Sequence, residues 1–190
     1  MLGKFAAGVV FALGIALLPV APASAASSKE TQRAEVRKTS QNVLKQLYRI
    51  HPSAKGTIAS AAGYAVFSNF GMKIFVAGGG GGSGMAVNNA TKHETFMKML
   101  EVQAGLGFGI KKFRVIFIFE TEEALNQFIN SGWEFGGQAT AAATTGKAGA
   151  AYQGAISVMP GVWMYQLTDK GLALELTGKG TKYYKNDDLN

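Results

Sequence analysis

Five consecutive glycines at residues 78–82, followed by Ser83 and Gly84, constrain the fold of this chain more than any other feature. Glycine lacks a Cβ atom, so it permits backbone conformations and close approaches that other residues forbid. The run follows residues 73–77, which are apolar and rich in strand-forming side chains. Two incompatible interpretations follow: a loop that binds phosphate, or a sheet bend where neighbouring backbone packs closely.

The phosphate interpretation requires more than glycine. Gly79, Gly81 and Gly84 match the dinucleotide pattern G-x-G-x-x-G, but any run of glycines produces that match. The mechanism also needs a helix to begin after the third glycine, so that its N-terminus faces the pyrophosphate. Residues 85–88 instead predict a strand, and no Lys-Ser/Thr pair follows as in a P-loop. The sequence therefore favours the sheet interpretation.

Other segments extend the predicted sheet. Residues 63–67 predict a strand. Residues 102–110 alternate small Gly105, Gly107 and Gly109 with bulky side chains, which predicts one strand with a bare face that packs closely on a neighbour. The continuous apolar run at residues 115–119 is typical of a strand buried on both faces.

The remaining strand predictions lie in the C-terminal part of the chain. The Ala-, Thr- and Gly-rich tract at residues 136–154 predicts closely packed strands. Residues 161–167 and 172–177 flank the turn at residues 168–171 and predict a hairpin, and residues 180–184 predict a closing strand.

Two helices are predicted beside the sheet. The first spans residues 28–50, where apolar side chains recur at helical spacing before Pro52 and Gly56 end the segment. The stripe consists of Val36, Val43, Leu44, Leu47 and Ile50. The second helix starts after Thr121, an N-cap residue, and ends at Gly132. Together these elements predict an α+β fold. Its sheet is a Gly-rich antiparallel, barrel-like or strongly bent sheet, with an N-terminal amphipathic helix and a short helix after the central strand.

Residues 1–25 predict a secretory signal peptide, and residues 26–190 a single domain. Lys4 is a basic start, an apolar run of roughly 14 residues follows, and Ala23-Ser24-Ala25 matches the A-x-A cleavage pattern. The run is shorter than the ~20 residues of a spanning helix. Because the chain has no cysteine, it has no lipobox and no disulfide. We therefore expect a periplasmic or secreted protein.

The excess positive charge is local. The formal net charge is +7, and residues 28–55 alone carry seven basic and two acidic side chains, a net of +5. The basic residues are Lys29, Arg33, Arg37, Lys38, Lys45, Arg49 and Lys55, and the acidic residues are Glu30 and Glu35. Such clustering indicates an anionic surface as partner. The helix has two readings: a surface helix docked on the domain, or a membrane-surface helix with its apolar stripe in the interface.

A second basic cluster, Lys111, Lys112 and Arg114, is predicted at a hairpin tip between two strands. It reads either as a charged turn that protects a sheet end from aggregation or as a second contact for anionic head groups. The sequence pI near 9.6 is also compatible with nucleic acid, but export makes a nucleic-acid partner an unexpected one.

The chain offers little for catalysis. It has two histidines, His51 and His93, and neither stands in a metal-binding spacing such as H-E-x-x-H. His93 and Glu94 could form a base with its orienting carboxylate, but neighbouring side chains point apart, so a solvated loop histidine is favoured. We read Asp187 and Asp188 as a frayed acidic end. We therefore expect no catalytic residues, no cofactor and no metal.

In their order and spacing, several segments resemble the SYLF-domain family over residues 28–190. They are Gly-Tyr-Ala-Val-Phe at residues 63–67, the glycine block with Ser83-Gly84, Gln-Ala-Gly-Leu-Gly-Phe-Gly at residues 103–109, the strand at residues 115–119 with Ala124, Leu125 and Phe128 after it, and Gly-Thr-Lys-Tyr-Tyr-Lys at residues 180–185.

The resemblance implies a non-enzymatic domain that binds anionic phospholipids, with a link to actin in fungi. In eukaryotic members an amphipathic basic helix before the glycine block contacts the membrane, which corresponds here to residues 28–55. An exported bacterial protein is not expected to meet phosphoinositides or actin in its own cell, and the lipobox cysteine of many bacterial relatives is absent. We therefore expect peripheral contact with phosphatidic acid, cardiolipin or a similar lipid through the two basic clusters. In that case the apolar helix stripe also enters the membrane interface. The alternative is an envelope structural or protein-interaction module without direct lipid binding, in which the stripe is buried core and the basic face solvates the domain.

Overall fold

The computed structural model describes residues 23–74, 77–104, 109–135, 152–169, 171–173 and 181–190. Its helices are α1 (Ala23–Ile50), α2 (Ala54–Ser60) and α3 (Glu122–Ser131). Its strands are β1 (Gly63–Ile74), β2 (Ala77–Asn88), β3 (Glu94–Ala104), β4 (Gly109–Phe119), β5 (Trp133–Phe135), β6 (Ile156–Met159), β7 (Val162–Thr168), β8 (Gly171–Ala173) and β9 (Thr181–Lys185).

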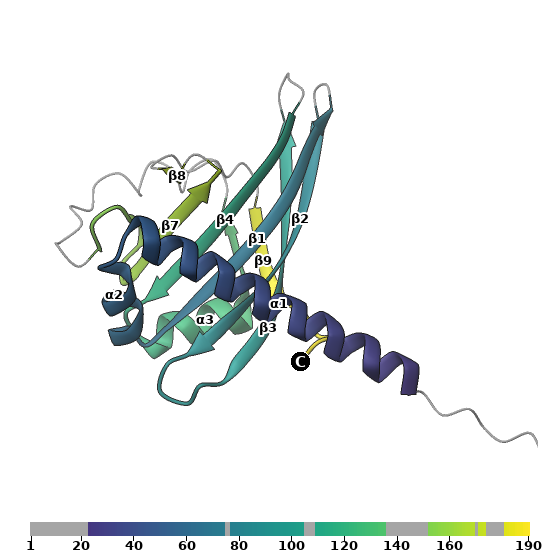
Figure 1. Ribbon diagram of the computed structural model, residues 1–190, viewed down its shortest axis with the longest axis horizontal. Coiled ribbons are helices and arrows are strands. Elements are labelled where there is room, and N and C mark those ends of the chain that lie inside the picture. Colours follow the sequence, from purple (N-terminus) through teal and green to yellow (C-terminus); the bar gives the residue numbers. More distant parts are fainter. Residues whose placement is uncertain (1–22, 75–76, 105–108, 136–151, 170, 174–180) are drawn as a thin grey trace, which may run out of the picture.

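The described strands form one antiparallel sheet in the order β5-β9-β3-β2-β1-β4-β7-β6, with β8 paired to β7. The long strands β1 to β4 form its curled centre, α1 runs across one face, and α3 lies against the other (Figure 1). We call these the α1 face and the α3 face. The predicted α+β fold with a strongly bent antiparallel sheet and two flanking helices is confirmed.

The α3 face carries a core built largely from aromatic rings. Phe128 of α3 lies 5.5 Å from Phe117 and 5.0 Å from Phe119 of β4, measured between ring centroids. Trp133 and Phe67 complete the cluster, and all five side chains are buried. Such aromatic contacts contribute beyond the area that they bury. The helix α3 is therefore fixed to the sheet by its own apolar side.

The α1 face carries a second core. Val43 and Leu47 of α1 and Ile58 of α2 pack against a separate set of sheet residues. That set is Val66 of β1, Ile116 and Ile118 of β4, and Tyr165 and Leu167 of β7. Residues 115–119 thus alternate between two cores, as predicted for a strand buried on both faces.

The glycine run lies inside β2, where it pairs with β1 on one side and with β3 on the other. Two of its members differ in what surrounds them. A Cβ atom at Gly84 would collide with the carbonyl oxygen of Val66 and the ring of Phe67, whereas a Cβ at Gly81 would meet nothing described within 4 Å. Close packing of bare backbone is therefore confirmed at Gly84 and wrong at Gly81.

Two strand boundaries were predicted wrongly. Residues 102–110 do not form one strand, because β3 ends at Ala104, β4 begins at Gly109, and β1 and β2 separate these two strands in the sheet. Residues 73–77 do not form a strand either, since β1 ends at Ile74 and β2 begins at Ala77. Glycine-rich strands lack the side-chain periodicity from which ends are read.

The predictions for α3 and for the start of the C-terminal hairpin are confirmed, while residues 174–177 of the predicted second hairpin strand lie outside the described residues. The Thr121 hydroxyl accepts a hydrogen bond from the amide of Ala124 at 3.2 Å, and Gly132 ends the helix with a φ of 67°. The strands β7 and β8 pair across the predicted turn, and β9 closes the sheet beside β3. Within the tract predicted as packed strands, residues 136–151 lie outside the described residues, and the segment from Tyr152 to Gly154 forms a turn.

Replacing Gly84 with alanine should lower the free energy of unfolding by about 1–3 kcal/mol, the usual cost of an overpacked site. Gly81→Ala is the matched control, because the same methyl group enters open space in the same strand. It should leave stability unchanged or raise it slightly, since alanine costs less backbone entropy than glycine. Urea denaturation of both variants measures the difference, and equal stabilities would contradict the packing described at Gly84.

Candidate functional site

Helix α1 presents its apolar stripe to the sheet. Val36, Val43 and Leu47 are 7%, 2% and 0% exposed, and Ser40 beside them is also buried. Leu44 is partly buried, but Ile50 in the last turn is 42% exposed, so its placement in the buried stripe is wrong. Of the two readings left open by the sequence, the docked helix is the one observed. The expectation that this stripe enters a membrane interface is wrong for this conformation, because the sheet already covers it.

The opposite side of the helix is basic and faces solvent. Lys38, Lys45 and Arg49 are exposed on this side of α1. They are spaced by seven and four residues, so they share one side of the helix. We call these three residues the outward basic face. Lys29, which precedes Val36 by seven residues and so lies on the stripe side of the helix, and Lys55 of α2 are also exposed. These five are the predicted site residues of the first cluster that the docked conformation leaves free to meet a partner.

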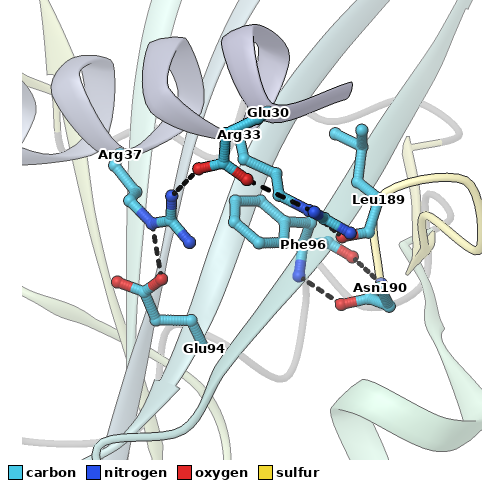
Figure 2. Close-up of polar contacts among 7 residues, drawn as sticks. All are labelled: Glu30, Arg33, Arg37, Glu94, Phe96, Leu189 and Asn190. Atoms are coloured by element: carbon cyan, nitrogen blue, oxygen red, sulfur yellow. Dashed lines mark hydrogen bonds and ion pairs between the residues drawn. The ribbon is translucent and has the colours of Figure 1, made fainter. Parts of the chain in front are cut away.

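The other two arginines of the cluster, Arg33 and Arg37, hold α1 to the sheet through Glu30, Glu94 and Leu189 (Figure 2). We call these five residues the clasp. Arg37 donates from Nε to Glu94 Oε2 of β3 at 2.7 Å and from Nη1 to Glu30 Oε1 at 3.1 Å. Its guanidinium also lies 5.2 Å from the ring centroid of Phe96. These contacts give Arg37 a structural role, which the sequence did not predict because Glu94 is 57 residues away.

Arg33 joins the same clasp to the C-terminus of the chain. Its Nε donates to the carbonyl oxygen of Leu189 at 2.8 Å, and its Nη1 pairs with Glu30 at 3.3 Å. Asn190 then bonds to both backbone groups of Phe96 at 2.9 Å. Asp188 pairs with Lys98 at 3.1 Å, so the expected frayed acidic end is instead tied to the sheet.

The clasp shifts the ionisation of its members. Hydrogen bonds from Arg33 and then Arg37 lower the pKa of Glu30, and the hydrogen bond to Glu94 raises the pKa of Arg37. The Lys98 ammonium likewise lowers the pKa of Asp188. Glu30, Arg37 and Asp188 are therefore charged at neutral pH.

The second basic cluster lies within β4, not at a hairpin tip as predicted. In the register with β1, Lys111 stands opposite Gly71, Lys112 opposite Phe70 and Arg114 opposite Ser68. Arg114 is partly buried and donates to Asp169 at 3.3 Å, while the side chains of the two lysines lie outside the described residues. The apolar run begins directly after Arg114, and the strand that contains this run also includes the three basic residues before it.

The residues considered for catalysis do not assemble. His93 is exposed in the turn before β3, and the carboxylate of Glu94 is bound to Arg37, so it does not orient His93. Within the described ranges, no group of three or more metal-binding side chains comes together. Nor does any helix in these ranges combine the length and hydropathy needed to cross a membrane.

Breaking the clasp should weaken α1 docking by a modest amount. Arg37→Gln and Glu94→Gln should show a coupling of about 0.5–1 kcal/mol in a double-mutant cycle, the upper range for pairs that are partly exposed. Lys45→Gln on the outward basic face is the control and should change stability by less than about 0.5 kcal/mol. A coupling of zero, measured by urea unfolding, would show that the ion pair does not hold the helix.

The Glu30 contacts should respond to acid. Because the folded-state pKa of Glu30 is lowered, its contribution is present above the unfolded-state pKa and is lost as pH falls through the folded-state value. The stability difference between the native chain and Glu30→Gln should therefore shrink from about pH 7 to about pH 3, on either side of an ordinary glutamate pKa. A difference that stays constant over this range in urea titrations would contradict the pairing.

Comparison with known proteins gives two matches. A family model described as "Ysc84: Las17-binding protein actin regulator" matches residues 100–190, which include β4, α3, β7 and β9 but not α1. The chain is also 30% identical over 161 residues to "Beta cell expansion factor A" of Aeromonas veronii. That match covers 83% of this chain and 58% of the relative, so the chain spans less than two thirds of the relative's length.

Proposed function

We propose that this chain binds anionic phospholipid at a membrane surface. The family-model match over residues 100–190 and the relative from Aeromonas veronii show that it belongs to the SYLF family. Membership in this family suggests a domain related to lipid binding or actin regulation. The finer assignment rests on the outward basic face of α1, whose three cationic side chains are exposed while Val36, Val43 and Leu47 of the apolar stripe are buried against the sheet.

The distribution of charge over the two faces of the sheet supports this orientation. Residues 28–55, which include most of α1 and the first two residues of α2, carry a net charge of +5. Helix α3 on the other face carries no basic residue, and its two acidic residues, Glu122 and Glu123, are exposed. A molecule with this dipole approaches an anionic surface with α1 foremost.

The attachment is electrostatic and reversible. Each lysine or arginine near an anionic membrane contributes about 1 kcal/mol, so the three residues of the outward basic face account for about 3 kcal/mol at low salt. At about 0.1 M salt the Debye length is about 10 Å, and attraction between charges farther apart than this is largely screened. The folded domain can therefore adsorb without undocking α1 and without exposing Val43 or Leu47.

The proposal also covers where the protein works in the cell and whether it is an enzyme. Residues 1–25 have the pattern of a cleaved signal peptide, so we infer that the domain works in the periplasm or outside the cell. Its ligands are then phosphatidic acid, cardiolipin or similar lipids. The proposed function is non-enzymatic, and the outward basic face acts by binding alone.

Removing two charges from the outward basic face tests the proposal. Lys38→Gln/Lys45→Gln should weaken binding to phosphatidylcholine vesicles that contain phosphatidic acid or cardiolipin by about 30-fold, since two residues contribute about 2 kcal/mol. Vesicle flotation at low and high salt measures the change.

The matched control removes the same net charge elsewhere. Lys92 and Lys185 lie away from α1, in the turn before β3 and at the end of β9, and Lys92→Gln/Lys185→Gln should bind nearly as well as the native chain. Equal losses in the two double variants would show a non-specific effect of net charge. Absence of flotation with every anionic vesicle at low salt would rule out lipid binding and favour an envelope interaction module.

A further inference from the structure

A groove of about 520 Å³ runs between α1 and strands β2, β3 and β9. Its apolar walls are Val36 of α1, Leu100 of β3, Tyr184 of β9 and Leu189 near the C-terminus. Cavities of this size accommodate small-molecule ligands in other proteins. The clasp lies next to the groove, because Leu189 contributes to both.

The floor of the groove is bare backbone at Gly81. Gly81 lines the groove, and a Cβ atom there would meet nothing described within 4 Å. Its φ is not positive, so the backbone conformation does not demand glycine either. Glycine at this position keeps the groove open, unlike Gly84, where close packing explains its absence of a side chain.

Two large apolar side chains of the groove wall are exposed to solvent. Leu100 is 47% exposed and Tyr184 is 36% exposed. Tyr184 stands opposite Lys98 and Leu100 opposite Lys182 in the β3–β9 register, so the two apolar side chains are diagonal neighbours on the α1 face. Exposed apolar surface that is gathered in a groove indicates a binding site more than scattered residues do.

An unpaired buried oxygen lies at the same place. Asn186 lines the groove and is 6% exposed, and its Oδ1 has no hydrogen-bond partner among the described residues. Buried acceptors in folded proteins are nearly always paired, and an unpaired one costs free energy. Because the oxygen is itself buried, a ligand in the groove reaches it only if the neighbouring side chains move.

Lysines border the apolar wall of the groove. Lys98 lines it, and Lys182 is exposed next to Leu100 in the register. Three acidic side chains are close: Glu35 lines the groove, Asp188 is paired with Lys98, and Glu134 stands opposite Lys182 in the β5–β9 register. The combination of an apolar wall and lysines beside it suits an amphiphile with a phosphate head.

We propose that the groove binds one acyl chain of an anionic phospholipid, with the phosphate beside Lys98 and Lys182. This inference rests on the proposed function and deepens it. Adsorption through the outward basic face concentrates the protein at the membrane, and the groove then takes up a chain from a single lipid molecule.

Calorimetry with a single-chain ligand tests the groove in the absence of a membrane. The probe is 1-oleoyl lysophosphatidic acid below its critical micelle concentration, and glycerol 3-phosphate is the comparison because it has the same head group without the chain. Lysophosphatidic acid should bind at least about tenfold more tightly, since each buried methylene strengthens binding about fourfold. Equal binding of the two ligands would overturn the proposal.

Filling the groove provides the matched pair of variants. Gly81→Leu places a side chain on the groove floor, and Gly56→Leu places the same side chain in open space on α2. Gly81→Leu should lower affinity for lysophosphatidic acid at least about tenfold, while Gly56→Leu should not. Both variants should still float with anionic vesicles, because neither change touches the outward basic face.

The outcomes separate the groove from the proposed function. Equal affinity of the two leucine variants for lysophosphatidic acid, or no binding of it by a native chain that floats with vesicles, would overturn the groove alone. Binding of lysophosphatidic acid without vesicle flotation would support the groove and contradict surface adsorption. If circular dichroism shows that Gly81→Leu is unfolded, Leu100→Gln at an exposed wall position replaces it and should show the same tenfold loss.

Discussion

The burial of one side of α1 against the sheet is the interaction on which the rest of the structure depends. Val43 and Leu47 enter a core with residues of β1, β4 and β7, and this contact fixes which side of the helix meets solvent. An amphipathic basic helix that is free in solution can place its apolar side in a membrane. Here that side is already occupied, so the helix offers a partner its charge and not its hydrophobic stripe.

Docking also divides the basic residues into two groups with different roles. Arg33 and Arg37 lie at the edge of the buried stripe, where Glu30, Glu94 and the C-terminal carbonyl of Leu189 engage them. Arginine suits this task because its planar group makes several hydrogen bonds at once. The exposed lysines keep their charge available to a surface, and lysine is a compact, strongly hydrated charge on a flexible stem. The same helix is thus a structural element on one side and a charged surface on the other.

Sequence periodicity predicted the elements whose side chains repeat regularly. The apolar spacing of α1, the Thr121 cap of α3 and the doubly buried run at residues 115–119 were all predicted correctly. Strand ends in glycine-rich segments were not, because glycine carries no pattern of faces. Of the candidate site, composition located the basic segment. The clasp escaped prediction because Arg37 and Glu94 meet only through tertiary packing, and the groove escaped because an open floor at Gly81 has no local signal.

Membrane depth of single spin labels tests most directly whether the docked helix meets lipid by its outward side. Because the chain has no cysteine, Gln41→Cys and Asn126→Cys each allow one unambiguous nitroxide. Gln41 is exposed between Lys38 and Lys45 on α1, and Asn126 is exposed on α3 at the opposite face of the sheet. On anionic vesicles, electron paramagnetic resonance power saturation should place the label at residue 41 at the head-group level and the label at residue 126 in water. A label at residue 41 within the acyl chains, or one that stays in water while residue 126 approaches the membrane, would contradict attachment through the docked helix.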